Sequence, residues 1–385
     1  MGKRYPYPIA VAPTGNHRLA HPDGELATSR AVASHGVTMG ASTFSNASLE
    51  NIIKAGMKVP RAEGIPEPNY WLQLYCFHRK EVAENLIRRA EKAGYKAVVL
   101  TVDLPYPGKR YNELRNGFSL PPHVRYGNFN LPPSVSISPE NSAEQDLAMK
   151  TKSSGPSDNS EIPHVDSSLE NKSGNAGLYF GLRFSCRGGD CHGGYPGPVR
   201  CISRHVLGSH HSMVEKSDLD ENHRQSMGSP WTAKVLNKKG ITTWEDAKAA
   251  AEYKVDAVWV SNHGGRQLDT SPSSLDALHE IVDVLRPSHP EIAILFDSGV
   301  MRGTDVFKAV AIGADLCFVG RAALWGLAYD GQKGVELALQ LLADELKTTM
   351  GLAGVRKLTE IRRSHLGFVK PEGGIQSLED RSARL

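Results

Sequence analysis

The feature that most constrains the fold of this chain is a repeated alternation of short apolar runs with longer amphipathic stretches. The apolar runs end in polar or glycine residues, which is typical of βα units whose parallel strands share one sheet. Seven of these candidate strands are visible, at residues 7–13, 37–42, 71–75, 97–103, 257–263, 293–299 and 316–321. The pattern therefore predicts a large α/β fold.

Two of the amphipathic stretches have clear helix ends. Apolar residues recur at helical spacing after Val82 and stop at Gly94, and a second set begins at Val306 and stops at Gly313. Glycine is the residue that most readily takes the left-handed conformation at a helix C-terminus. We therefore predict that each of these stretches is a helix that follows a strand.

An eighth strand, at 234–240, is less apolar than the others, but the residues after it predict a helix start. Thr242 and Glu245 have the spacing of a capping box, in which each side chain bonds the backbone N–H of the other residue. Eight βα units would close into a parallel barrel, so we predict a (β/α)8 TIM barrel of the α/β class. An open doubly wound sheet is the alternative.

The composition changes sharply between the fourth and fifth predicted strands. We divide the chain into a first half-barrel at 1–127, an irregular insertion at 128–229, a second half-barrel at 230–365 and a C-terminal tail at 366–385. The first half of the insertion is rich in Ser, Pro, Asn and Glu and lacks periodicity. This composition predicts a partly disordered surface segment.

The second half of the insertion contains cysteines and histidines among glycines. Cys186, Cys191, Cys201 and His205 are residue types that bind zinc, but their spacing is loose and no paired CxxC is present. We therefore predict an irregular loop with incidental cysteines and no metal site.

The charge balance and the apolar runs exclude several classes of partner. The 45 Lys and Arg residues nearly balance the 42 Asp and Glu residues, which leaves a net charge of +3. This balance gives no basic surface for nucleic acid, and no apolar run approaches the roughly 18 residues that a membrane-spanning helix needs. Five cysteines are too few, and of odd number, for a disulfide framework. We expect neither a nucleic-acid nor a membrane partner.

The most informative segment is SNHGGRQLD at 261–269, which directly follows the apolar run AVWV. Residues at the C-terminal ends of barrel strands face the active site, so we predict that His263 and Arg266 share one pocket. A histidine can accept a proton near neutral pH, and an arginine can hold a carboxylate through two parallel hydrogen bonds. Taken alone, the segment also fits a structural histidine beside a glycine turn.

Six other short segments accompany this motif: APTG at 12–15, QLY at 73–75, LTVD at 100–103, KG at 239–240, DSGVMRGTD at 297–305 and GR at 320–321. Together, these segments resemble the FMN-dependent α-hydroxy-acid oxidase and dehydrogenase family, which includes glycolate oxidase, lactate oxidase and lactate monooxygenase. They occur in the order typical of the family, over residues 5–125 and 239–365.

The resemblance implies substrate-directed roles for five residues. His263 would remove a proton from the substrate, and Asp103 would stabilise the imidazolium that forms. Arg266 and Arg110 would bind the substrate carboxylate. Tyr75 would hydrogen-bond the hydroxyl or keto oxygen of the substrate.

The resemblance also implies an FMN site. Lys239 would be a catalytic residue that stabilises the negative charge on reduced flavin, and the alternative for this residue is a solvated charge. The remaining residues implied to bind FMN are Pro13, Thr14, Gly15, Ser42, Gln73, Thr101, Ser261, Asp297, Ser298, Gly299, Arg302, Gly320 and Arg321. Glycine loops and helix N-termini after the last two strands would expose backbone N–H groups to the phosphate.

Several positions depart from the pattern of the family. Met301 stands where Arg is usual, which predicts weaker FMN binding, and Phe44 stands where Trp is common, which would reshape the substrate pocket. Gly15 replaces a common Ala and leaves room beside the flavin, which would favour oxidative decarboxylation. Because the chain begins almost at the first strand, we expect it to lack the N-terminal segment that supplies a further active-site tyrosine in this family.

We therefore expect an FMN-dependent oxidase that converts a small L-2-hydroxy acid to the 2-keto acid and uses dioxygen as acceptor, which gives hydrogen peroxide. The alternatives are a decarboxylase similar to lactate monooxygenase and a non-catalytic or decayed paralogue that binds flavin weakly. Members of the family are commonly tetrameric, so we expect a homotetramer. The final tripeptide Ala383-Arg384-Leu385 predicts a peroxisomal location, with the cytoplasm as the alternative.

Overall fold

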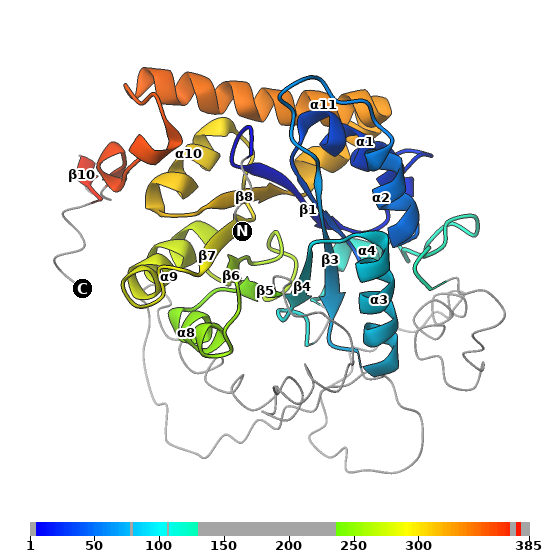
Figure 1. The fold of residues 1–385 in the computed structure, drawn as a ribbon. Helices are drawn as coiled ribbons and strands as arrows, with labels where there is room; N and C mark the ends of the chain where they lie inside the picture. Colours follow the sequence, from blue (N-terminus) through cyan, green and yellow to red (C-terminus); the bar gives the residue numbers. More distant parts are fainter. Residues whose placement is uncertain (1–4, 78–79, 106–107, 130–235, 370–374, 379–385) are drawn as a thin grey trace, which may run out of the picture.

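The strands of the chain form a closed parallel barrel, as seen in a computed structural model that describes residues 5–77, 80–105, 108–129, 236–369 and 375–378 (Figure 1). The strands are β1 (Ile9–Thr14), β2 (Thr38–Ala41), β3 (Asn69–Tyr75), β4 (Ala97–Thr101), β5 (Leu236–Ile241), β6 (Ala257–Val260), β7 (Ala293–Asp297) and β8 (Leu316–Val319). Each strand pairs with the next one along the chain, and β8 pairs with β1. The predicted TIM barrel is therefore confirmed, and the open doubly wound sheet is wrong.

Two pairings decide that the barrel closes. Strand β1 lies parallel to β8, with Ala10 opposite Phe318. Strand β5, whose sequence is the least apolar, pairs with β4 through Thr101 and Lys239 and with β6 through Lys239 and Trp259. The fifth strand exists as predicted, displaced by one or two residues toward the C-terminus.

Helices cover the outside of the barrel (Figure 1). They are α1 (Glu25–His35), α2 (Leu49–Met57), α3 (Lys80–Ala93), α4 (Tyr111–Arg115), α8 (Trp244–Glu252), α9 (Ser274–Ser288), α10 (Gly303–Ile312) and α11 (Arg321–Leu352). Gly94 follows α3 with φ +98°, and Gly313 follows α10 with φ +134°, so both predicted helix ends are confirmed. Helix α11 is interrupted at Asp330 and Gly331. A short antiparallel pair, β9 (Gly367–Val369) and β10 (Ile375–Ser377), follows it.

The start of α8 differs from the prediction by one residue. Thr243, not Thr242, is the N-cap, and its side chain accepts a hydrogen bond from the backbone N–H of Asp246, not Glu245. Strand β5 continues to Ile241, and Thr243 has the extended backbone that an N-cap needs. Tertiary pairing of β5 therefore moved the helix start that local spacing predicted.

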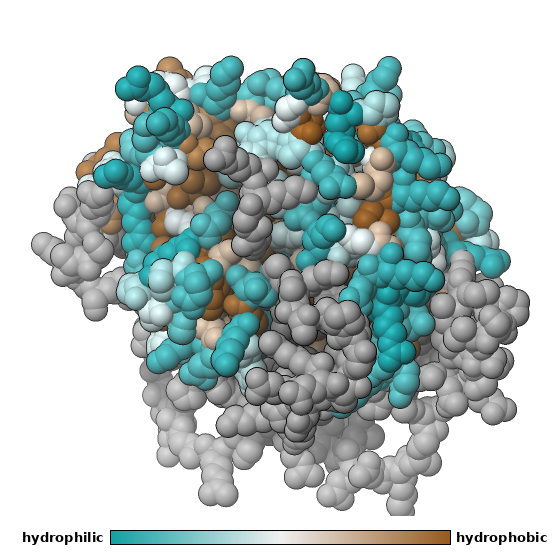
Figure 2. Space-filling model, in the orientation of Figure 1, coloured by the Kyte–Doolittle hydropathy of each residue, from teal (hydrophilic) through white to brown (hydrophobic). Residues whose placement is uncertain are grey.

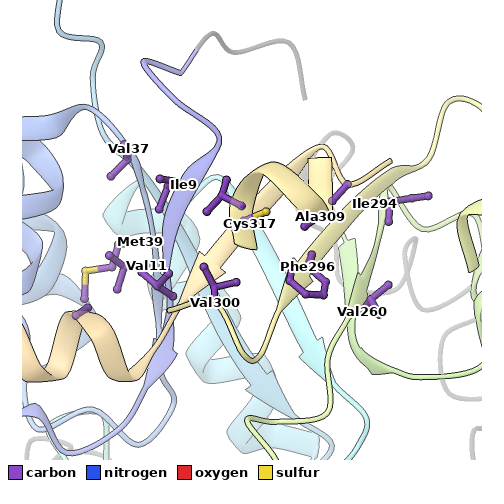
Figure 3. Packing of buried hydrophobic residues seen from close by; sticks show 14 of the residues in the cluster. Ile9, Val11, Val37, Met39, Val260, Ile294, Phe296, Val300, Ala309 and Cys317 are labelled. Atoms are coloured by element: carbon purple, nitrogen blue, oxygen red, sulfur yellow. The ribbon is translucent and has the colours of Figure 1, made fainter. Parts of the chain in front are cut away.

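Apolar residues pack in two layers on either side of the sheet. The outer layer joins strands to helices, and Figure 3 shows Cys317 of β8, Phe296 of β7 and Ala309 of α10 within it. The inner layer fills the barrel with Ala10, Ala12, Trp71, Ala97, Val99, Ala257, Trp259, Leu295, Leu316 and Phe318. Because successive side chains of a strand point to opposite faces, strands β1, β3, β4, β6, β7 and β8 contribute alternate residues to the two layers.

The surface visible in Figure 2 is mostly hydrophilic, with smaller apolar patches between the polar residues. Over the described ranges, no helix combines the length and apolar character needed to cross a bilayer. The predicted insertion lies between β4 and β5, and most of it falls at 130–235, outside the described residues. The predictions for its disorder, for its cysteines and for the C-terminal tripeptide also fall outside them. These predictions stay predictions, as do the domain boundaries and the homotetramer.

Candidate active site

A ring of residues lies directly above the apolar interior of the barrel, at the C-terminal ends of the strands. Six of its members come two positions after a residue of the inner apolar layer, so alternation along the strand places them on the inner side of the barrel. The ring consists of Thr14, Ser42, Gln73, Thr101, Lys239, Ser261, Asp297 and Gly320. All eight were predicted to bind FMN, and the fold places them on the face where TIM barrels carry their active sites.

Neighbouring members of this ring contact one another. Gln73 Nε2 donates to Thr101 Oγ1 at 3.0 Å, and the backbone N–H of Thr43 donates to Gln73 Oε1 at 3.2 Å. A Cβ atom added to Gly320 would lie 3.3 Å from Thr14 Cγ2, so the first and last strands also approach closely here. These contacts join Gln73 to Thr101 and bring Thr14 close to Gly320 where the barrel closes.

Lys239 is buried in this ring, which excludes the solvated-charge alternative. Its Nζ donates to Ser261 Oγ at 2.8 Å and lies 3.4 Å from Asp297 Oδ2. The side chains of Lys239 and Asp297 are only 5% and 8% exposed, and Ser261 is fully buried. Asp297 and Ser261 hold this ammonium group in place, so it can stabilise a negative charge that appears beside it.

His263 and Asp103 form the predicted pair. His263 Nδ1 lies 3.0 and 3.1 Å from the two carboxylate oxygens of Asp103, although the residues are 160 positions apart. Burial raises the pKa of the Asp103 carboxyl, but Lys239 and the hydrogen bond with His263 together outweigh burial and lower that pKa below its ordinary value. Asp103 is therefore an anion that can stabilise a protonated imidazole.

The loop after β6 needs an unusual backbone to present His263. His263, Gly264 and Gly265 all have positive φ, at +58°, +69° and +72°. The strain of a non-glycine residue in this region is balanced by hydrogen bonds at both ends of the loop. The backbone N–H of His263 donates to Ser261 Oγ, that of Gly264 donates to Ser298 Oγ, and Arg321 Nη2 donates to the carbonyl of Gly264.

The two arginines predicted to bind the substrate carboxylate both donate hydrogen bonds to the same residue, Glu113. Arg266 Nη2 donates to Glu113 Oε1 at 3.0 Å, and Arg110 Nη1 donates to Glu113 Oε2 at 3.4 Å. Tyr75 lies close enough to Asp103 and Arg110 to interact with them electrostatically. Burial, followed by the charge of Asp103, raises the pKa of Tyr75 to about 12, so its hydroxyl keeps its proton and can donate.

A cavity of about 410 Å³ lies beside this site, over the ends of β6 and β7. Its lining includes Gly264, Gly265, Ser298, Gly299 and Arg321. Glycine backbone and one guanidinium group suit a phosphate, and the buried Lys239 suits the electron-rich edge of a flavin. The residues present therefore fit FMN.

The remaining predicted FMN residues lie around this core. A Cβ atom added to Gly15 would lie 3.0 Å from the carbonyl oxygen of Phe44, and Pro13 packs against Gly40. Arg302 is the exposed N-cap of α10, and its backbone N–H donates to Asp305 Oδ2. Arg302 is not among the residues that line the cavity, so the structure brings Arg321 to it and leaves Arg302 at its edge.

Several residues that support the site were not predicted. Buried Glu25 accepts hydrogen bonds from the backbone N–H groups of His17, Asn46 and Ala47, and it thereby ties the loop after β1 to the loop after β2. Glu113 was also missed. Its partner Arg266 is 153 positions away, so local spacing, which pairs Glu113 only with Arg110, did not indicate that it bridges the two arginines.

Comparison with known proteins agrees with this site. The family model described as "FMN-dependent dehydrogenase" matches residues 1–368. The chain is 36% identical to Oxidase FUB9 of Fusarium oxysporum f. sp. lycopersici over 377 residues, which cover 98% of this chain and 78% of that protein. It is 34% identical to human 2-hydroxyacid oxidase 1 over 364 residues, which cover 94% of this chain and 79% of that protein.

A solved structure of a mandelate oxidase variant with an FMN adduct is similar as well, with 30% identity and a TM-score of 0.62. The match covers 94% of this chain and 80% of that chain. The ring of strand-end residues, the His263–Asp103 pair and the matches over almost the whole chain agree with one another. The chain therefore belongs to the FMN-dependent dehydrogenase family and is an FMN-dependent hydroxy-acid oxidase.

Proposed function

We propose that this enzyme oxidises a small L-2-hydroxy acid to the 2-keto acid and uses dioxygen as its electron acceptor, which gives hydrogen peroxide. The observation that carries the proposal is the His263–Asp103 pair at 3.0 Å beside two arginines on the same rim of the barrel. The substrate loses two electrons and two protons, and dioxygen gains both. Relatives named 2-hydroxyacid oxidase and glycolate oxidase support this reaction class.

Each side chain has a defined task in this reaction. Because Nδ1 of His263 faces Asp103, its Nε2 takes the proton from the substrate, and the Asp103 carboxylate stabilises the resulting imidazolium. Arg266 and Arg110 hold the substrate carboxylate, and the Tyr75 hydroxyl donates to the substrate oxygen. The chemistry that bound FMN would supply is electron transfer between the substrate and dioxygen. Lys239 supplies the positive charge that favours this electron acceptance.

The first test is anaerobic bleaching of the flavin absorbance by glycolate, lactate and mandelate. We expect His263→Gln to keep its flavin but to reduce it at least about a hundredfold more slowly, because the variant lacks the base. His289→Gln, a substitution at the end of α9, should behave like the parent protein. Bleaching of the His263 variant at the parent rate would refute the assigned base, and a colourless protein that takes up no added FMN would favour the decayed-paralogue alternative.

The products separate oxidase from monooxygenase chemistry. An oxidase releases the 2-keto acid and hydrogen peroxide in equal amounts during aerobic turnover. If the space at Gly15 retained the two products together, they would react to give an acid one carbon shorter, carbon dioxide and water. We propose the oxidase outcome, and detection of the shortened acid as the main product would overturn it.

A further inference from the structure

Glu113 occupies the donors that the substrate carboxylate requires. One of its carboxylate oxygens lies 3.0 Å from Arg266 Nη2 and the other lies 3.4 Å from Arg110 Nη1. A single carboxylate thus bridges both guanidinium groups, which is how a bound substrate would use them under the proposed function. Glu113 and the substrate carboxylate carry the same charge, so they repel each other if both approach this pair of arginines.

The ion pairs between Glu113 and the two arginines are weak enough for a substrate to displace them. The side chains of Arg266, Glu113 and Arg110 are 43%, 39% and 34% exposed, and ion pairs with this much solvent contact are weak. Glu113 belongs to α4, a single turn in which no residue is buried. Movement of Glu113 away from the arginines would therefore expose no apolar core.

The bridge also leaves one donor unused. Arg110 Nε is buried and makes no hydrogen bond to any described part of the chain. A buried donor without a partner is costly, and a carboxylate that approached Arg110 through Nε and one Nη would remove this cost with two parallel hydrogen bonds. Glu113 contacts only Nη1, so it is a poorer ligand than a substrate carboxylate can be.

We propose that Glu113 is a specificity-determining residue that acts as an internal competitor for the substrate carboxylate. It holds Arg110 and Arg266 in the free enzyme, and a 2-hydroxy acid binds by displacing it from at least one of them. This inference rests on the proposed function, because that function assigns the two arginines to the substrate carboxylate. It predicts that removal of the Glu113 charge strengthens binding of a monocarboxylate.

The test is the dissociation constant of 2-hydroxyisobutyrate, measured by calorimetry on the FMN-loaded protein. This probe has the carboxylate and hydroxyl of a substrate but no hydrogen on C2, so it binds without being oxidised. We expect Glu113→Gln to bind the probe about three- to tenfold more tightly, because a partly exposed competing ion pair is lost. Equal or weaker binding would overturn the inference and indicate that Glu113 instead orients the arginines.

Two further variants complete the test. Glu84→Gln removes an exposed carboxylate that pairs with Arg88 on α3, so it should leave the dissociation constant unchanged. Arg266→Ala should bind the probe much more weakly. If Arg266→Ala bound the probe as tightly as the parent protein, the proposed substrate site itself would be wrong. If Arg266→Ala weakened binding but Glu113→Gln did not strengthen it, the proposed function would stand and the proposed role of Glu113 as a competitor would be wrong.

Discussion

Asp103 is the residue at which most charges of the site converge. Its carboxylate faces His263 directly, and Lys239 acts on it electrostatically. These positive neighbours outweigh the effect of burial and lower its pKa from the ordinary 3.8. A carboxylate with a depressed pKa stabilises the folded state wherever it is ionised in both states.

This depressed pKa predicts a pH dependence of stability. The Asp103 contribution is fully present above the unfolded pKa, near 3.8, and is lost as the pH falls through the lower folded pKa. The difference in free energy of unfolding between the parent protein and Asp103→Asn should therefore be larger at pH 5 than at pH 3. Urea unfolding at these two pH values measures it. A difference that grows from pH 5 to pH 3 would contradict the assigned sign.

Met301 is the residue whose replacement should most improve cofactor binding. Its side chain is 57% exposed next to the N-terminus of α10, and Arg321 supplies the guanidinium that lines the adjacent cavity. Met301→Arg would add a charge-assisted hydrogen bond to the phosphate and should lower the dissociation constant of FMN about tenfold. Quenching of FMN fluorescence by the apoprotein measures this constant. Met57→Arg, an exposed change on α2, is the control, and equal effects of the two variants would refute a specific contact.

At the scale of single residues, the sequence predicted the residues of the site but not the residues that hold them in place. His263 and Arg266 lie within one motif, and the family resemblance added Asp103, Lys239 and most of the strand-end ring. The roles of Glu25 and Glu113 carried no such signal, because Glu25 binds two separate loops and Glu113 reaches Arg266 only after folding. A carboxylate that binds backbone N–H groups of two loops resembles any other glutamate in a sequence.

At the scale of single elements, the start of α8 gives a direct test of the structure. Thr243 accepts from the Asp246 backbone N–H, so Thr243→Ala should reduce the free energy of unfolding by about 1 kcal/mol. Thr242→Ala removes a hydroxyl that does not cap the helix and should cost less than about 0.5 kcal/mol. Chemical denaturation of both variants measures the two costs. If Thr242→Ala cost more free energy of unfolding than Thr243→Ala, the helix would begin where the spacing predicts.

Strands and helices were predicted with unequal precision. All eight strands and the ends of α3 and α10 were predicted, because apolar periodicity and C-terminal glycines act within a few residues. The bounds of the strands differ from the prediction by up to three residues, as at β6, predicted at 257–263 and observed at Ala257–Val260, and the N-cap of α8 differs by one. Strand ends depend on pairing with neighbouring strands, which local propensity does not contain.

At the scale of the whole molecule, the aromatic filling of the barrel supports the ring above it. Trp259 is fully buried, its ring lies 3.9 Å from that of Phe318 between centroids, and Trp71 lies 6.3 Å away. These three residues come from three different strands, so they join distant parts of the chain. Lys239 Nζ also lies 5.8 Å from the centroid of the Trp259 ring, directly linking the filling to the site.

Trp259→Ala should therefore destabilise the whole barrel, by about 3–5 kcal/mol, because it leaves a cavity that the surrounding strands cannot fill. Trp325→Ala is the matched control, since Trp325 is 55% exposed on α11, and it should cost less than about 1 kcal/mol. Thermal and urea unfolding of the two variants measure both costs. Equal destabilisation by the two variants would show that the aromatic residues inside the barrel do not stabilise it as proposed.

The sequence by itself determined the βα order and the strand count, and it predicted the residues of the site. It could do so because alternation of apolar residues, helix-ending glycines and the segment at 261–269 are local patterns. The tertiary structure alone decided which distant charges meet: Asp103 with His263, Lys239 with Asp297, and Glu113 with Arg266. The reason is geometric, since closure of eight strands brings positions 58 to 160 residues apart to one rim, and no local interaction encodes that distance.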